Sequence, residues 1–356
     1  MNKFRTWCVL LFLAAMPAFA QYQTPTVDGT VSLGEYAHSS GNWYLTWDAT
    51  YLYVAKTNLT NANNGVVVYL DIDPQSTPTA GSNSNGNTVG TTDFSVTPTE
   101  LAFRADARIL GIPSNPEIKS RDGSGSWGSF DSSPSNIIEA TNGSTREMRV
   151  AWTALAGLTG IPSSFRWLGF ETSTNNVFDS MPAANGSFIG SSNATLLYAY
   201  KISSTADGAA TDPFSDQESS LYVLFNTPPV LNAVIGIANG DATSSRRFIV
   251  FNHINNNTIN TTSDLTAITR TTTIDGTTAP GYSSTPVLVI NGFSTNINND
   301  HGIRLTSCTG CVVRGLVLQD HGFAIQITDG SGNSVVGNYI GTNSAGTGAV
   351  ANSIGV

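Results

Sequence analysis

Hydrophobic residues in this chain occur in short runs rich in aromatic and β-branched side chains, and polar turn residues separate these runs. Runs of this kind, bounded by Asp, Asn and Gly, are typical of antiparallel strands. In the first half of the chain they lie at 43–47, 52–55, 66–70, 147–152 and 165–170. Their spacing predicts an antiparallel β-sandwich over residues 21–201, and no long amphipathic helix is expected in the chain.

The pattern changes in the last third of the chain, where an internal repeat appears. A shift of 22 residues superimposes segment 302–306 on segment 324–328, and it also places Val313 on Val335. A period of this length suits one coil of a parallel β-helix, in which inward aliphatic side chains stack from coil to coil. We therefore predict an all-β chain that ends in the first coils of a parallel β-helix, over residues 246–356.

The segment between these two parts, residues 202–245, is rich in Ser, Thr, Ala and Asp and contains Pro213, Pro228 and Pro229. This composition predicts a linker with peripheral strands. At the other end, the last strand-like segment reaches Val356 without the further coils and cap that a solenoid needs. We expect an incomplete β-helix and a fragment of a longer protein.

Several short motifs follow one another in the predicted sandwich. They are Val-Asp-Gly at 27–29, Gly-Glu-Tyr at 34–36, Trp-Asp at 47–48, Tyr-Leu-Asp-Ile-Asp at 69–73, and the strand 147–155. In this order they resemble the N-terminal module of the family 9 carbohydrate-binding, or DOMON-like, β-sandwiches, although Ala151 stands where that family usually has proline. The resemblance implies sugar binding, haem binding or a structural role. Haem is disfavoured because His38, the only histidine in this region, lacks the setting of an axial ligand.

The last hundred residues resemble a second group of proteins. The motifs are Thr-Ile-Asp-Gly-Thr-Thr at 273–278, Val-Arg-Gly-Leu at 313–316, and Gly-Asn-Tyr-Ile-Gly-Thr at 337–342. They strongly resemble right-handed parallel β-helix proteins of the pectate-lyase-like superfamily. The resemblance implies right-handed coils and, in the polysaccharide lyases and hydrolases of this fold, catalytic Asp, Lys or Arg on one outward strand face.

The candidates for such catalysis in the predicted β-helix are six titratable residues, Asp300, His301, Arg304, Arg314, Asp320 and His321. The two Asp-His-Gly copies among them lie 20 residues apart, which is out of step with the repeat of 22. We interpret both copies as turns. Because no pair has a spacing that a mechanism requires, the sequence assigns no catalytic residue.

The N-terminus has the pattern of a secretory signal peptide over residues 1–20. Lys3 and Arg5 precede an apolar run at 7–15, and Ala-Phe-Ala at 18–20 suits cleavage by signal peptidase. A membrane anchor is disfavoured because a spanning helix needs roughly 20 apolar residues. The protein is therefore expected to be secreted or displayed at the cell surface.

The chain is acidic, with a formal net charge of −9 at pH 7. Removal of residues 1–20 leaves 14 basic and 25 acidic residues, or 14 − 25 = −11. A negative surface repels nucleic acid and anionic lipid, and no later segment is apolar enough for membrane insertion. The expected partner is a polysaccharide or a cell-surface glycan, and acidic polysaccharides are disfavoured unless cations bridge the charges.

Sugar binding needs exposed aromatic faces, because the C–H groups of a pyranose stack on a π-system. Trp127 lies in a Gly-Ser-Trp-Gly segment that predicts an exposed loop, and it is the first candidate together with Trp43. The alternative is that both rings are buried, as aromatic side chains usually are.

Acidic residues after the strand at 66–70 suggest a cation site. Asp71 and Asp73 alternate at the strand end, and Asp93 follows a loop that contains Asn83, Asn85 and Asn87. Oxygen ligands of this type suit calcium, although the spacing is not that of an EF-hand. A structural Ca2+ bound by Asp71, Asp73 and Asp93 is one interpretation, and a solvated polar loop is the other.

Cys308 and Cys311 stand in a Cys-Thr-Gly-Cys turn. In an exported protein they can form a tight disulfide, and buried free thiols are the alternative. A thioredoxin-like role would need a βαβ context, and a metal site would need two more ligands.

These observations favour a secreted or cell-surface protein that binds glycans without catalysis in this part of the chain. Two alternatives remain open at the level of the sequence. One is the N-terminal part of a polysaccharide lyase or glycoside hydrolase whose active coils lie beyond residue 356. The other is a structural or adhesive surface protein.

Overall fold

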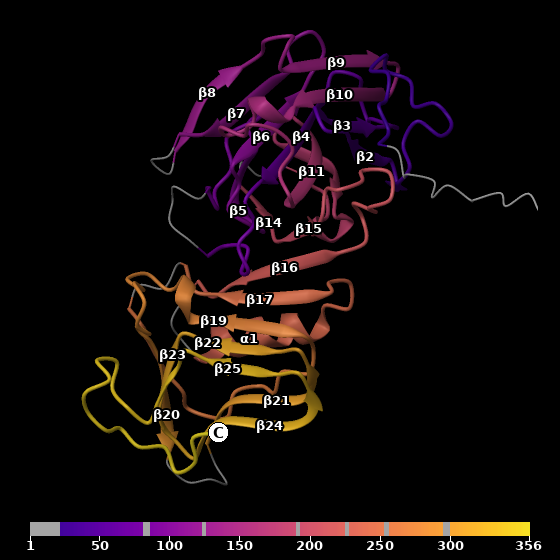
Figure 1. The fold of residues 1–356 in the computed structure, drawn as a ribbon. Helices are drawn as coiled ribbons and strands as arrows, with labels where there is room; N and C mark the ends of the chain where they lie inside the picture. The colour runs from indigo at the N-terminus through magenta and orange to yellow at the C-terminus, as the bar shows by residue number, and fades with distance from the viewer. Residues whose placement is uncertain are drawn as a thin grey trace, which may run out of the picture.

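The computed structural model describes residues 22–80, 86–122, 126–189, 193–224, 228–252, 256–294 and 300–356. Strands dominate the described chain, which confirms the predicted all-β class. The predicted signal peptide at 1–20 and the loop residues Asn83 and Asn85 lie outside the described residues. Figure 1 shows the N-terminal half above and the C-terminal half below, with β16 between them.

Two sheets pack face to face in the N-terminal half. The first is antiparallel and consists, in spatial order, of β1 (Ser39–Ser40), β2 (Trp43–Trp47), β3 (Tyr51–Lys56), β10 (Thr145–Ala151) and β9 (Ile137–Asn142). The second has as its antiparallel part β8 (Trp127–Asp131), β7 (Glu117–Arg121), β6 (Ala107–Gly111), β4 (Gly65–Asp71), β11 (Phe165–Ser173) and β15 (Tyr198–Ile202). Aromatic and aliphatic side chains from both sheets form one buried core between them.

Smaller elements flank this pair of sheets. They are β12 (Asn176–Met181), β13 (Phe188–Ile189), the parallel pair β5 (Thr97–Leu101) and β14 (Asn193–Leu196), and the short 3-10 turns at Trp152–Ala154 and Ala183–Asn185.

Strict alternation along β2 and β3 sorts their side chains between two faces. Trp43 and Trp47 enter the core between the sheets, whereas Tyr44 joins a tyrosine cluster on the opposite face. On β3, Val54 faces the core and Tyr53 faces the tyrosine cluster. Successive strand residues point to opposite faces, so neighbours in the sequence serve different surfaces.

The second sheet continues into the C-terminal half without a break. Beyond β15 it contains β16 (Gln217–Tyr222), β17 (Arg246–Val250), β19 (Thr272–Asp275), β22 (Val312–Arg314) and β25 (Ser334–Val336). β16 pairs antiparallel with β15 and parallel with β17, and all later neighbours are parallel.

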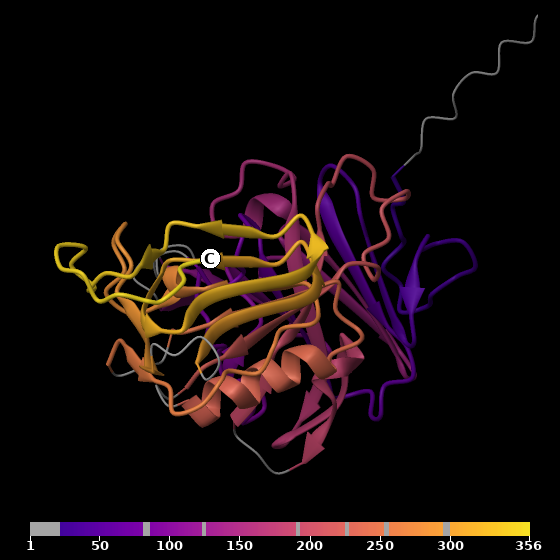
Figure 2. The same cartoon turned by 90° about the horizontal axis from the view of Figure 1, so that it is seen from below.

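Two further parallel ladders complete the C-terminal half. One contains β18 (Thr258–Asn260), β20 (Leu288–Ser294), β23 (Leu316–His321) and β26 (Tyr339–Ile340), and the other pairs β21 (His301–Thr309) with β24 (Phe323–Ser331). A 3-10 turn lies at Gly276–Thr278. Figure 2 shows these strands stacked around a common interior, which is filled by aliphatic side chains.

The predicted 22-residue shift is the observed register of the last coils. Ile303 pairs with Ile325 in β21 and β24, and Val313 pairs with Val335 in β22 and β25. Earlier strands pair over longer separations, since Ile274 of β19 also lies beside Val313. The 22-residue repeat in the sequence therefore corresponds only to the pairing of the last strands, β21–β23 with β24–β26, where the intervening loops have constant length.

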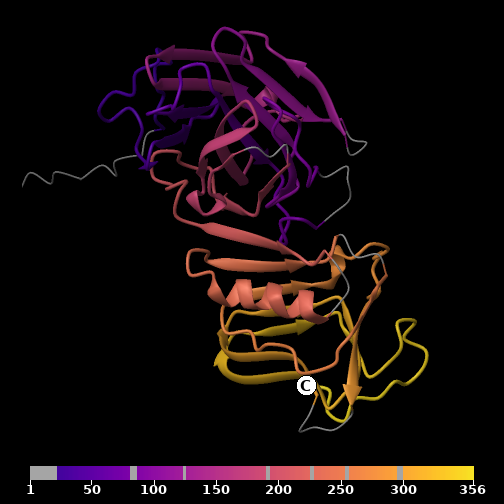
Figure 3. The same ribbon diagram turned by 180° about the vertical axis from the view of Figure 1, so that it is seen from behind.

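The segment 202–245 differs from the predicted linker with peripheral strands. β16 is buried along its whole length and has hydrogen-bonded neighbours on both sides. It is followed by α1 (Pro228–Gly240), a helix that lies beside the parallel strands (Figure 3). Leu231, Ile235 and Ala238 of this helix are buried in the C-terminal core. Their spacing is that of one helical face, and proline is favoured at the first helical position. No helix in the described ranges is long and apolar enough to cross a membrane.

Candidate functional site

A cluster of tyrosines covers part of the outer face of the five-stranded sheet. Tyr44 of β2 lies against Tyr36, with ring centroids 5.6 Å apart and planes inclined by 59°. A hollow of about 390 Å³ opens here. Its lining consists of Val31, Ser32, Leu33, Gly34, Tyr36 and Tyr44. Tyr44 is half-buried and Leu33 is fully exposed, so the hollow presents aromatic and aliphatic surface to solvent.

Two carboxylates, Glu35 and Glu147, hold the segment that forms this hollow, and Glu35 accepts from the backbone N–H groups of Thr26 (2.8 Å) and Ser32 (2.7 Å). Glu147 of β10 accepts hydrogen bonds from the backbone N–H groups of Asp28 (3.1 Å), Gly29 (2.9 Å) and Thr30 (3.1 Å). It also accepts one from the hydroxyl of Tyr36 (3.2 Å). Burial raises the pKa of Glu147. Gly29 has φ +84°, and a Cβ there would lie 2.7 Å from the backbone nitrogen of Asn142. The Val-Asp-Gly and Gly-Glu-Tyr motifs thus have a physical role as the cradle of Glu147.

The two tryptophans predicted to bind sugar occupy other positions. Trp43 has no exposed surface, and its indole N–H donates to Asp179 at 3.2 Å. The prediction that Trp43 stacks on a sugar is wrong. The alternation of side chains along β2 turns Trp43 into the core and its neighbour Tyr44 outward.

Trp127 lies in strand β8 and not in a flexible loop. It is half-buried, its ring meets Tyr69 edge-on at 5.8 Å, and its indole N–H donates to the carbonyl of Val89 at 3.0 Å. Part of the ring remains accessible, so Trp127 stays a second candidate contact.

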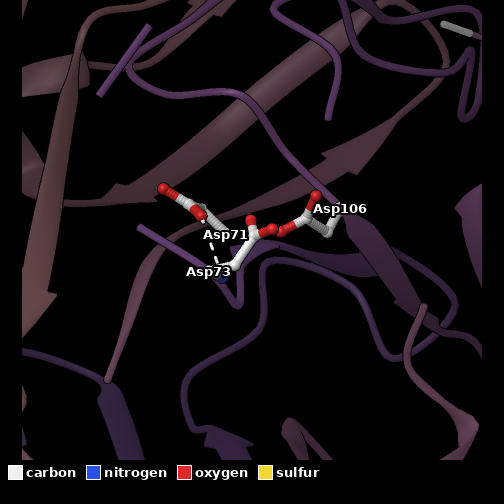
Figure 4. Close-up of side chains that lie close together, drawn as sticks. All are labelled: Asp71, Asp73 and Asp106. Carbon is white, nitrogen blue, oxygen red and sulfur yellow. Dashed lines mark hydrogen bonds between the residues drawn. The ribbon is translucent and has the colours of Figure 1, made fainter. Parts of the chain in front are cut away.

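Three carboxylates meet where β4 ends. Asp71, Asp73 and Asp106 each offer an oxygen, and these oxygens lie within 4.8 Å of one another (Figure 4). Asp106 directly precedes β6, whose Ala107 pairs with Leu70 of β4, so the strand register places it beside Asp71. The sequence alone does not show this register, and it therefore contains no signal for Asp106.

Asp93, the third predicted ligand, does not belong to this group. It forms an ion pair with the buried Arg108 at 3.0 Å, and burial raises the pKa of Asp93 to about 6. The predicted ligand set is therefore corrected to Asp71, Asp73 and Asp106, because antiparallel pairing and not loop proximity brings the third carboxylate in.

Two arginines balance the three carboxylates only in part. Arg121 pairs with Asp106 at 2.9 Å and with Asp73 at 3.4 Å. Arg166 pairs with Asp71 at 3.2 Å, but it also pairs with Glu218 at 2.7 Å. Asp71 and Asp106 are buried whereas Asp73 is exposed, and a proton or a cation can neutralise the buried carboxylates.

The pKa values of the two buried carboxyls respond to this burial. Burial is the main cause that raises the pKa of Asp71 to about 7. Burial, followed by the charge of Asp71, raises the pKa of Asp106 to about 8. Oxygen donors of this kind suit a hard cation such as Ca2+, and its charge would favour the ionised carboxylates.

Five of the six titratable candidates in the C-terminal half have charged partners. Asp300 and His321 are fully buried and lie 3.0 Å apart. His301 contacts Asp264 at 3.0 Å, and Arg304 lies 3.6 Å from the same carboxylate. Arg314 is paired with Asp275 at 2.6 Å. Asp320 lies in strand β23 with φ +60°, so the interpretation of this Asp-His-Gly copy as a turn is wrong.

Cys308 and Cys311 are joined as a disulfide across a turn, with their Cα atoms 6.3 Å apart. Gly310 within the turn has φ +67°, which glycine adopts without strain. Both cysteines are buried in the core of the C-terminal half.

No protein-family model matches the chain, and no curated protein or solved structure shows significant similarity to it.

Proposed function

We propose that this protein is a non-catalytic glycan-binding protein of the cell exterior, and that the hollow beside Tyr44 is its sugar site. The observation that carries the proposal is the half-buried ring of Tyr44 beside the exposed Leu33. An aromatic face next to aliphatic surface suits the C–H face of a neutral pyranose, while Ser32 at the rim can hydrogen-bond its hydroxyls.

The proposed site is held in place before any ligand arrives. Glu147 anchors residues 28–30 and the hydroxyl of Tyr36, so the segment that walls the hollow is tied to β10. A preformed wall lowers the ordering cost of binding. This arrangement supports a binding role for the tyrosine face more than a purely packing role.

The test is retention of the whole chain on a panel of neutral polysaccharides. We expect retention on at least one glycan, and Tyr44→Ala should weaken it roughly three- to tenfold because one stacking contact is lost. Trp127→Ala measures the second candidate, and Tyr282→Ala, in the C-terminal half, is the matched control.

Absence of retention on every glycan would overturn the proposal and favour the structural or adhesive alternative. Equal losses for Tyr44→Ala and Tyr282→Ala would also reject the hollow as the site. Cleavage of a retained polysaccharide by the purified chain would instead support the enzymatic alternative.

We further propose that Asp71, Asp73 and Asp106 bind a structural Ca2+. The close approach of their three oxygens, two of them on buried carboxylates, and their common end of β4 support this assignment. Addition of CaCl2 should raise the melting temperature of the wild type and of Asp93→Asn, which lies outside the group, but not of Asp106→Asn. Equal responses of Asp106→Asn and the wild type would exclude the site.

A further inference from the structure

A second cavity lies where the loop after β4 meets the parallel strands of the C-terminal half. It has a volume of about 190 Å³. Its lining consists of Ser76, Thr77, Arg246, Phe248, Thr273, Val312 and Arg314. Two arginines and three hydroxyls thus surround a small space, whose remaining wall is the apolar pair Phe248 and Val312.

The strand register explains why these residues meet. Phe248 of β17, Thr273 of β19 and Val312 of β22 form one row across three neighbouring strands. Arg246 and Arg314 stand two positions before and two positions after this row on their own strands, and so lie on the same face. The sheet therefore presents one cation at each end of an apolar floor.

Arg314 is held in the cavity wall by contacts through a single nitrogen. Its Nη2 donates to Asp275 (2.6 Å), Thr77 (2.7 Å) and Ser76 (3.2 Å). Its Nε–H is buried and has no hydrogen-bond acceptor among the described residues. Solvent does not reach this Nε–H, so Arg314 contributes to the cavity mainly through the positive charge of its guanidinium.

Arg246 supplies the charge that remains uncompensated. Its Nη1 donates to the Gly310 carbonyl at 3.2 Å and to the Thr273 hydroxyl at 3.4 Å, and no carboxylate pairs with it in the described chain. Glu218, its neighbour in the ladder, is committed to Arg166 at 2.7 Å. With Asp275 opposing Arg314, the cavity keeps a formal excess of one positive charge.

We propose that this cavity binds an oxyanion, a carboxylate or a sulfate group, through Arg246 and the positive charge of Arg314. The hydroxyls of Ser76 and Thr273 can complete its hydrogen bonds, and guanidinium groups suit the planar geometry of such oxygens. The net charge of −9 does not oppose this, because the Debye length is about 8 Å at physiological ionic strength. Local charges within the cavity decide the interaction.

The oxyanion can be a free ion or a substituent of an acidic glycan, and the second source rests on the proposed glycan-binding function. We would titrate the whole chain with sodium sulfate at low millimolar concentration and with acetate, at constant ionic strength, by calorimetry. We expect Arg246→Ala to weaken sulfate binding about tenfold or more, since a charge-assisted hydrogen bond is lost. Arg246→Lys should restore part of the affinity.

Arg270→Ala is the matched control, because Arg270 is exposed on the same half and does not line the cavity. Dextran sulfate and unmodified dextran, which share a backbone, separate the two sources. If the protein binds dextran sulfate more tightly than unmodified dextran, and Arg246→Ala abolishes that difference, the anion is carried on a glycan. If the protein binds inorganic sulfate but does not prefer dextran sulfate, the ligand is a free ion.

Absence of sulfate and acetate binding, or equal binding by the wild type and Arg246→Ala, would overturn the proposal. The outcome is distinguishable from failure of the tyrosine site. Tyr44→Ala should leave sulfate binding unchanged, and loss of neutral-glycan retention would not affect the sulfate titration.

Discussion

At the scale of single residues, Glu147 and Gly29 fix the turn at residues 28–30 of the N-terminal segment. Glu147 collects three backbone N–H groups, and this geometry requires the chain to turn at Gly29 with φ +84°. A side chain at Gly29 would meet the backbone of Asn142. Gly34 has a similar φ of +80°, but a Cβ there would meet nothing within 4 Å.

Gly29→Ala should therefore destabilise the protein more than Gly34→Ala. Both substitutions strain a left-handed backbone at a cost of about 1 kcal/mol, and only the first adds a collision with backbone atoms. Urea unfolding followed by tryptophan fluorescence measures both free energies of unfolding. Equal losses would show that the close approach to Asn142 is relieved by movement of the segment.

The carboxyl groups of Asp71 and Asp106 make stability depend on pH. Their folded pKa values, about 7 and about 8, exceed the unfolded value of about 3.9. Between about pH 4 and pH 8 the folded state then binds more protons than the unfolded chain, so the free energy of unfolding falls as pH rises.

We expect this fall to reach up to about 1.4 kcal/mol per pH unit for each proton, in buffer with a chelator. Denaturant unfolding at pH 5, 6, 7 and 8 measures the slope. Asp106→Asn should flatten it, because the asparagine cannot titrate. A slope that persists unchanged in Asp106→Asn would place its origin elsewhere in the molecule.

At the scale of elements, α1 contributes through one face. Ile235 is fully buried in the C-terminal core, whereas Ile237 on the same helix is 53% exposed. The Ser, Thr, Ala, Asp and Pro content of residues 202–245 predicts a linker, but the apolar residues of α1 form one face when the backbone is helical. Burial of that face, more than helix propensity, holds α1 in place.

Ile235→Ala should lower the free energy of unfolding by about 2–5 kcal/mol through the cavity that it leaves. Ile237→Ala, the matched control, removes the same atoms from an exposed position and should cost less than about 1 kcal/mol. Thermal and urea unfolding of both variants supply the comparison. Similar losses would mean that α1 does not pack on the core as described.

At the scale of the whole molecule, a single sheet runs through both halves. β16 has an antiparallel neighbour in the N-terminal half and a parallel neighbour in the C-terminal half. Arg314 and Asp275 of the parallel strands also contact Thr77 from the loop after β4. Hydrogen bonds and buried charge therefore cross the junction at two separate places.

This continuity predicts one cooperative unfolding transition for the whole chain. Neither half can open without exposing an edge of β16, whose residues are all buried. Calorimetry should give a calorimetric enthalpy equal to the van't Hoff enthalpy. Two resolved transitions would show that the halves unfold independently.

The amino-acid sequence determines the local features of this protein, because they depend on residues close together in the chain. Alternation specifies the strands, the repeat of 22 specifies the register of Ile303 and Ile325, and turn chemistry places Gly29. The all-β class follows from these patterns. They also locate Asp71 and Asp73 at a strand end.

Only the tertiary structure decides which distant residues meet. Strand pairing brings Asp106 to Asp71, and sheet packing turns Trp43 inward while Tyr44 faces the hollow. The cavity between Arg246 and Arg314 likewise depends on rows of parallel strands separated by loops of unequal length. Such contacts arise from long-range pairing, which no local pattern in a single sequence records.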